Sequence, residues 1–325
     1  MKPFAYERPD DPAGALATMV RPGAAYLAGG TNLVDLMKLG VAAPDVVVDV
    51  NALPFHDVEP APGGGLAIGA LVPNSDLARH PAVRAGYPAV AQALLSGASG
   101  QLRNRATVAG NLMQRTRCRY FQDVTKACNK RVPGSGCDAR EGEHHDLAIL
   151  GASPQCVATN PSDLAVALSI MDASVHYLGP HGSAAISVHD FFRRPGDQPD
   201  RDTSLPRGAL ITAVVLPELP IAAGSVYRKV RDRASFAFAA GSVAAALDVR
   251  DGIVREARLA WGAVAHLPWR AWAAERALRG APATVASFER AADAELSAAR
   301  TLRDNGYKVP LLRNLTVEVL RELAR

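Results

Sequence analysis

The most informative segment for the fold is the turn Leu27-Ala28-Gly29-Gly30-Thr31-Asn32-Leu33. It follows a short apolar stretch at 25–28 and precedes a run of helical spacing that ends at Gly40. Glycines between a strand and a helix let a ligand approach the backbone closely, and the first N–H groups of the helix have no partners of their own. The segment therefore predicts a seat for a pyrophosphate. It is not G-x-G-x-x-G, and a plain structural turn is the competing interpretation.

A second segment that could line a ligand is Ala98–Leu112, ASGQLRNRATVAGNL. It mixes small residues with hydroxyl and amide side chains and has no clear helical or strand period. Such a strip can line a ligand with its backbone, although an irregular connection would look the same.

All the cysteines of the chain lie in one stretch, at Cys118, Cys128, Cys137 and Cys156. The stretch has no regular period, and long loops of this kind are usually functional or disordered. Two disulfides would indicate an oxidising compartment. A structural zinc site would usually pair its cysteines as C-x2-4-C, a spacing that is absent here. An iron–sulfur cluster needs four thiolates and tolerates wider spacings.

Composition excludes several classes of function. With 325 residues, 48% of them hydrophobic, the chain can form two or three domains or subdomains. Aromatic residues make up only 6% and do not alternate with basic ones, so we expect no binding of nucleic acid. There is no apolar run long enough to span a membrane and no secretory signal, so by its own sequence the chain is expected in the cytoplasm.

Basic residues crowd the cysteine stretch although the net charge is only +4. They could form a solvated face, compensate an anionic cluster or dock a redox partner. These residues are Arg115, Arg117, Arg119, Lys126, Lys130 and Arg131.

Short strands and helices alternate through residues 4–97, which predicts an α+β or α/β layered structure. After the cysteines, the pattern predicts a helix at 162–171, a hairpin around 179–182 and a strand at 210–216. The chain then changes character and indicates a separate C-terminal domain. Its predicted strands are 225–229, 241–249 and 254–263, and its predicted helices are 269–278, 285–302 and 315–324.

Taken together, these segments resemble the FAD-binding subunits of the molybdenum hydroxylase (xanthine dehydrogenase) family. The resemblance implies a PCMH-type (vanillyl-alcohol-oxidase-like) FAD-binding domain over 1–217, with two α/β subdomains at about 1–56 and 57–217. A smaller C-terminal domain of antiparallel sheet and helices would cover 218–325. The motifs that carry the resemblance are 28–32, Ile68-Gly69-Ala70, 103–112, Pro161-Ser162-Asp163, Phe191-Phe192, Leu210-Ile211, Lys229 with Arg233, and 305–310.

Most members of this family join Leu112 to Pro161 within a few residues, whereas here about fifty residues intervene and contain all four cysteines. This insertion, at about 113–160, resembles the subset whose flavin subunit holds an additional [4Fe–4S] cluster. That subset includes flavin subunits of bacterial aldehyde oxidoreductases, the periplasmic type above all, and of 4-hydroxybenzoyl-CoA reductase. The resemblance implies that Cys118, Cys128, Cys137 and Cys156 are the cluster ligands.

The resemblance also implies roles for individual residues. Residues 27–33 would hold the FAD pyrophosphate, and Asp163 would hydrogen-bond the ribose or phosphate end. A helix N-terminal carboxylate and an exposed strand lysine are the alternatives for Asp163 and Lys229. Two departures from the family pattern are Ala109, usually glycine, and Ala237, often aspartate. Thr107, Gly110 and Asn111 would line the cofactor, with Ile211 and Lys229 near the isoalloxazine.

The expected function is electron transfer in a heterotrimeric aldehyde oxidoreductase. A molybdenum-cofactor subunit would oxidise the aldehyde, a [2Fe–2S] subunit would pass the electrons on, and FAD would deliver them to oxygen, a quinone or a carrier protein. No catalytic residue is assigned to this chain. Co-export with a signal-bearing partner would place the complex in the periplasm.

Other functions remain open at this point. The chain could be a flavin subunit of a hydroxybenzoyl-CoA reductase or of a xanthine-dehydrogenase-like enzyme. It could also be a stand-alone flavin oxidase with a structural cysteine or zinc loop, or a zinc-stabilised interaction module. His144-His145 is interpreted as a loop pair rather than a ligand pair.

Overall fold

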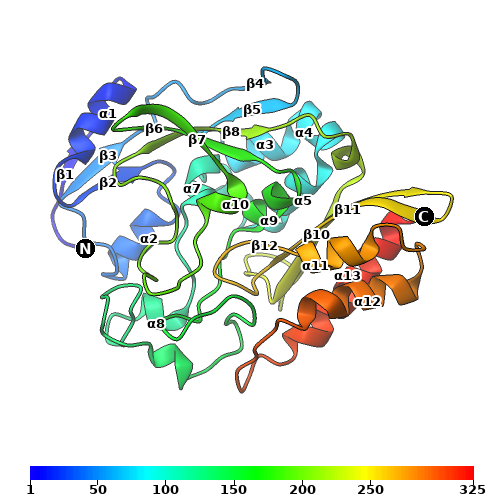
Figure 1. Ribbon diagram of the computed structural model, residues 1–325. Coiled ribbons are helices and arrows are strands. Elements are labelled where there is room, and N and C mark those ends of the chain that lie inside the picture. The colour runs from blue at the N-terminus through cyan, green and yellow to red at the C-terminus, as the bar shows by residue number, and fades with distance from the viewer.

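The computed structural model describes residues 1–325 and contains three sheets (Figure 1). The first sheet is parallel, in the order β1-β3-β2, with helix α1 after β1 and α2 after β2. Asp11 begins α1 by accepting a hydrogen bond from the backbone N–H of Gly14 at 2.7 Å. The bounds are β1 (Ala5–Glu7), α1 (Pro12–Met19), β2 (Ala24–Leu27), α2 (Leu33–Lys38) and β3 (Val46–Asp49).

The second sheet has the order β4-β5-β8-β6-β7, and all of its pairs are antiparallel. This subdomain is therefore α+β, one of the two possibilities that the sequence pattern left open, and not the α/β subdomain that the family resemblance implied. A single apolar core joins the sheet to helices from both sides of the cysteine insertion. The strands are β4 (Val58–Pro60), β5 (Leu66–Gly69), β6 (Ser174–Gly179), β7 (Gly182–Ser187) and β8 (Leu210–Leu216), and the helices α3 (Asn74–Arg79), α4 (Pro81–Gly86), α5 (Pro88–Ser96), α7 (Val108–Leu112), α9 (Asp163–Ile170) and α10 (Val188–Phe191).

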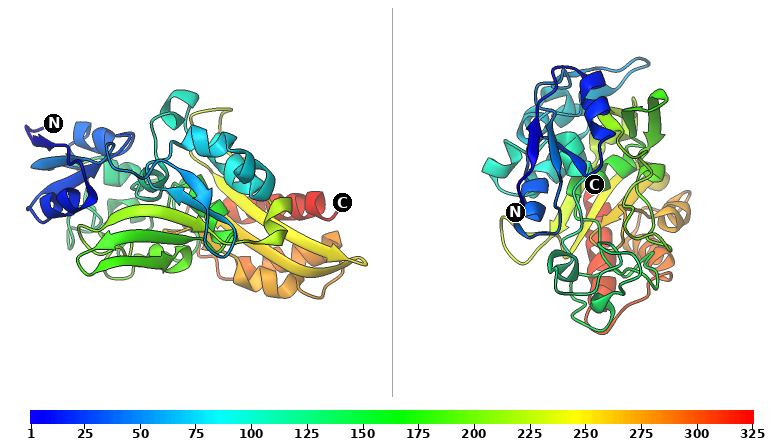
Figure 2. Two further views of the ribbon diagram at one scale, coloured as in Figure 1. Left: turned by 90° about the horizontal axis from the view of Figure 1, so that it is seen from above. Right: turned by 90° about the vertical axis from the view of Figure 1, so that its left-hand side faces the viewer.

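The C-terminal sheet, in the order β12-β11-β10-β9, is covered on both faces (Figure 2). Successive residues of a strand point to opposite faces. Val243 and Ala245 accordingly pack with the C-terminal helices, whereas Ala244 packs with α9 and the second sheet. The bounds are η2 (Pro220–Gly224), β9 (Val226–Val230), β10 (Gly241–Arg250), β11 (Ile253–Gly262), β12 (Trp269–Arg270), α11 (Trp272–Leu278), α12 (Val285–Leu296) and α13 (Lys308–Leu323).

Several predicted elements have other limits in the structure. The helix predicted at 269–278 starts only at Trp272, because Trp269 and Arg270 pair with β11 as a short strand. The helix predicted at 285–302 ends at Leu296, and the one predicted from 315 begins at Lys308, with Pro310 in its first turn. The strip 98–112, predicted to be irregular, contains α6 (Gly100–Arg103) as well as α7.

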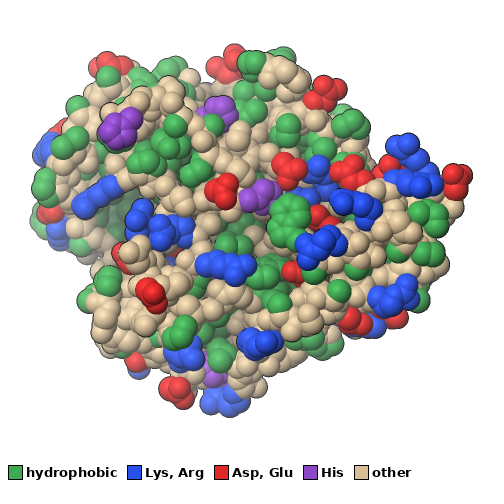
Figure 3. Space-filling model, in the orientation of Figure 1, with side chains coloured by type: hydrophobic (Ala, Val, Ile, Leu, Met, Phe, Trp, Pro, Cys, Tyr) green, Lys and Arg blue, Asp and Glu red, His purple; other side chains and the backbone are tan.

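The cysteine insertion folds as an irregular loop against the rest of the molecule, below α2 in Figure 1. Leu36 of α2 packs with Phe121 and Cys128 of the loop. Basic side chains gather in the middle of the face drawn in Figure 3, where the loop meets the other domains. No helix of the structure has the length and apolar character needed to cross a membrane. The short helices of the loop are α8 (Arg119–Gln122) and η1 (Asp138–Arg140).

Candidate functional site

A cavity of about 480 Å³ lies between the first and second sheets, and the turn 28–33 forms one of its walls. The glycines are required there. A Cβ on Gly29 would lie 1.8 Å from the carbonyl oxygen of Arg105, and Gly30 has a φ of +75°. Of the other residues expected to bind the cofactor, Thr107, Gly110 and Ile211 also line this cavity.

A second cavity of about 350 Å³ adjoins the first. Thr31, Asn32 and Gly110 line both, so an elongated ligand that filled both would cross the predicted pyrophosphate seat. The second cavity has more charged lining residues than the first, four of them basic and two acidic. Its charged lining residues are Asp35, Arg103, Arg117, Asp163, Lys229 and Arg233.

Two capped helices fix the polar lining of the second cavity. Thr107 caps α7 by accepting from the N–H of Gly110 at 3.2 Å. Ser162 caps α9 by accepting from the N–H of Ala165 at 3.0 Å. The Ser162 hydroxyl also donates to Oδ1 of Asn111 at 2.7 Å, so the start of α9 sets the position of Asn111.

Lys229 is a buried ion-pair partner rather than an exposed strand lysine. Its Nζ lies 2.7 Å from Oδ2 of Asp163, and the two side chains are only 3% and 11% exposed. The hydroxyl of Tyr227 donates to the other carboxylate oxygen at 2.5 Å. Burial, assisted by the charge of Asp163, raises the pKa of Tyr227 well above its usual value, so the phenol stays protonated. Asp163 thus uses both oxygens to hold Tyr227 and Lys229.

The two residues expected beside the isoalloxazine line different cavities. Ile211 lines the first cavity, on β8, and Lys229 lines the second, on β9. Asn111 and Asp163 line the second cavity together with Lys229.

The four cysteines are free thiols, so the disulfide interpretation is not what the structure shows. Cys128 and Cys137 face each other in an isolated antiparallel bridge. Burial raises the pKa of Cys118 and that of Cys156 to about 11, and the neighbouring thiols add to this effect. No three His, Cys, Asp or Glu side chains converge closely enough to hold one metal ion.

The basic residues of the loop do not form a uniformly solvated face. Lys130 is buried and bonds Asp202, while Arg131 donates to the carbonyls of Tyr120 and Phe121. Arg119, in contrast, is exposed and pairs with Glu143. Asp202 gave no signal in the sequence, because its partners lie far away along the chain.

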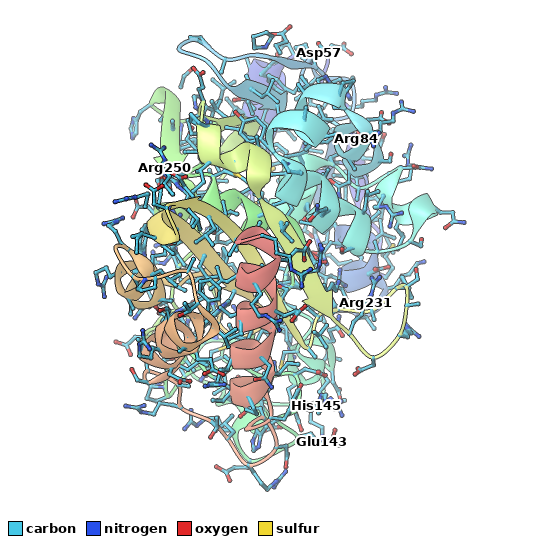
Figure 4. All side chains as sticks on the ribbon, turned by 90° about the vertical axis from the view of Figure 1, so that its right-hand side faces the viewer. Asp57, Arg84, Glu143, His145, Arg231 and Arg250 are labelled. Carbon is cyan, nitrogen blue, oxygen red and sulfur yellow. The ribbon has the colours of Figure 1, made fainter.

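The two histidines at 144–145 have structural contacts. His144 is buried with Nε2 2.8 Å from the carbonyl of Arg140, and His145 stacks on Tyr307 with ring centroids 4.7 Å apart. Figure 4 shows His145 near the lower end of α13, in accord with the loop-pair interpretation.

Two family models cover nearly the whole chain. The FAD binding domain in molybdopterin dehydrogenase matches residues 2–219, and the CO dehydrogenase flavoprotein C-terminal domain matches residues 225–323. The chain is an FAD-binding subunit of the molybdenum hydroxylase family. It is thus an oxidoreductase subunit of a multi-subunit molybdenum hydroxylase complex, and the expected family and α+β fold are confirmed.

Relatives of this subunit are similar over most or all of its length. It is 48% identical to the aldehyde oxidoreductase FAD-binding subunit PaoB of Escherichia coli, over 99% of this chain and 98% of PaoB. The glyceraldehyde dehydrogenase medium chain of Sulfolobus acidocaldarius is 27% identical, over 78% of this chain and 73% of its own. The fold matches carbon monoxide dehydrogenase from Hydrogenophaga pseudoflava with a TM-score of 0.76 at 24% identity, covering 99% of this chain and 98% of the other.

Proposed function

We propose that this chain is the FAD- and [4Fe–4S]-containing electron-transfer subunit of a heterotrimeric molybdenum-cofactor aldehyde oxidoreductase. In this proposal a [2Fe–2S] subunit supplies electrons, and FAD passes them to an external acceptor such as oxygen, a quinone or a carrier protein. The observation that carries the proposal is the full-length 48% identity to an aldehyde oxidoreductase subunit. The two joined cavities, which share the turn at Thr31 and Asn32, support it.

FAD supplies the electron-transfer chemistry, and the chain binds and orients it. Residues 27–33 would hold the pyrophosphate, because Gly29 and Gly30 let the ligand approach the backbone; of these residues, Leu27 is the one that does not line the first cavity. Lys229 offers a fixed positive charge in the second cavity, held by Asp163 at 2.7 Å. Because Asp163 compensates its charge, Lys229 would act on a reduced isoalloxazine as the positive end of an ion pair rather than as a free cation.

The four thiols supply the donor set of a [4Fe–4S] cluster. Each cysteine of such a cluster binds a different iron, so its ligands need not converge on one point, as those of a single zinc ion must. The loop brings Cys128 and Cys137 opposite each other in an isolated antiparallel bridge, so at least two of the four proposed ligands are neighbours. Lys130 and Arg131 would offset the negative charge of the cluster and raise its reduction potential.

The test is to measure iron, acid-labile sulfide and released FAD on anaerobically purified protein. About four iron and four sulfide per FAD are expected. Cys137→Ser should lose iron and still bind FAD, although more weakly, whereas Thr125→Ala, at an exposed position of the same loop, should keep both. Zinc in place of iron, or FAD with no metal, would contradict the cluster while leaving the flavin subunit intact.

A further inference from the structure

Asp202 is the centre of a partly buried ion cluster between the cysteine loop and the first cavity. Its carboxylate lies 2.5 Å from Nζ of Lys130 and also pairs with the guanidinium of Arg115. The Lys130 side chain is 1% exposed and donates to the carbonyl of Pro199 at 2.7 Å. A buried ammonium is costly without a compensating charge, so Lys130 requires Asp202 to stay in this position.

Arg115 connects the ion cluster to the proposed FAD site. Arg115 lines the first cavity, together with Thr203, the neighbour of Asp202. The backbone N–H of Arg115 donates to Oδ1 of Asn32 at 3.0 Å, and Asn32 belongs to the turn that would seat the pyrophosphate. A displacement of Asp202 would therefore be transmitted to the turn through Arg115 alone.

Lys130 connects the ion cluster to the cysteines. Lys130 follows Cys128 by two positions, and its charge also acts on the thiol of Cys156. A second connection runs in parallel, because Leu36 of α2 packs on Phe121 and Cys128. The helix that follows the pyrophosphate turn thus lies directly on the cysteine loop.

We propose that Asp202 is a positioning residue that couples the two cofactor sites. It holds Arg115 of the FAD cavity and Lys130 of the cysteine loop in one ion cluster, so that the iron–sulfur cluster and FAD strengthen each other's binding. This inference rests on the proposed function, because it assumes that the loop holds a cluster. Coupling of this kind is reciprocal, so the same factor must appear in both affinities.

The experiment compares FAD affinity with and without the cluster in the full-length chain. Flavin fluorescence gives the Kd for FAD in anaerobically purified protein and in protein stripped of iron by a chelator. Removing the cluster should weaken FAD binding by a factor of about 5 to 150 in the unaltered chain. In Asp202→Asn this factor should fall towards one, and in Asp202→Glu it should be partly restored.

Arg119→Gln is the matched control, because it breaks an exposed ion pair of the same loop and should leave the coupling unchanged. If Asp202→Asn does not fold, Arg115→Gln breaks the same connection from the cavity side. Equal FAD affinity in the loaded and stripped forms of the unaltered chain would overturn the coupling alone, and so would undiminished coupling in Asp202→Asn. An absence of iron in the purified protein would refute the cluster and the coupling together.

Discussion

Single residues around the two cavities depend on partners that are distant in sequence. Lys229 was predicted to lie near the flavin, but its burial follows from Asp163 and Tyr227, which come from α9 and β9. Asp163 and Lys229 each need a neighbouring opposite charge, since burying either charge alone would cost free energy. The resemblance to the family identified the candidate residue, whereas its environment came only from the tertiary structure.

His266 makes the stability of the protein dependent on pH. Its Nδ1 donates to the carbonyl of Arg193 at 3.0 Å, and burial lowers its pKa to about 4 from an ordinary value near 6.5. Between these two values the unfolded chain binds a proton that the folded chain excludes, so stability falls as the pH falls. The free energy of unfolding should decrease by about 3 kcal/mol from pH 7.5 to 4 on this account.

Denaturant unfolding over this pH range tests the prediction, with His266→Gln compared to the unaltered chain. The variant should lose a large part of the pH dependence. His181→Gln, in an exposed hairpin turn, serves as the control and should keep it. Parallel curves for the unaltered chain and His266→Gln would show that another group is responsible.

Among the elements, α9 connects helix stability to the cofactor site through its cap. Ser162→Ala removes the hydrogen bond to the N–H of Ala165 and the one donated to Asn111. The free energy of unfolding should fall by about 1 kcal/mol, as for other lost caps. FAD binding should also weaken, because Asn111 lines the second cavity and loses its anchor.

The control is Thr284→Ala, which removes the comparable cap of α12, outside both cavities. It should lower stability by a similar amount in urea unfolding and leave the FAD Kd unchanged. Equal effects of the two variants on FAD binding would mean that the cap of α9 has no special connection to the site.

The elements that were predicted well are those with local signals. Asp11-Pro12 before α1 and the glycines after β2 are signals of this kind. The errors in predicted element limits arose where tertiary contacts determine the local structure. Trp269 looks helical in its neighbourhood, but it pairs with β11 and donates from Nε1 to Oε1 of Glu295 at 2.8 Å. In the same way the turn between β2 and α2 was predictable, whereas the ion cluster of Asp202 was not, because its partners come from three separate segments.

At the scale of the whole molecule, the C-terminal sheet joins the domains into one body. Its two faces contribute to two different cores, one with the second sheet and one with the C-terminal helices. Arg270 strengthens this junction, since it pairs with Asp172 at 3.0 Å and with Glu275. The second cavity is built by both domains, because Asp163 of the FAD-binding domain and Lys229 of the C-terminal domain both line it. Binding of FAD in this cavity would therefore depend on the whole chain.

The same architecture predicts a division of labour within the complex. The cavities of this chain have the features of a cofactor site, and the substrate site would belong to the molybdenum subunit. The purified chain should therefore bind FAD and show no aldehyde oxidation in a dye-linked assay, whereas the assembled complex should be active.

After chemical reduction, the isolated chain should still transfer electrons to the dye, because that step needs only its own flavin. Lys229→Met should alter the rate of this transfer by changing the flavin potential. Aldehyde turnover by the isolated chain would instead mean that it is a complete flavin oxidase.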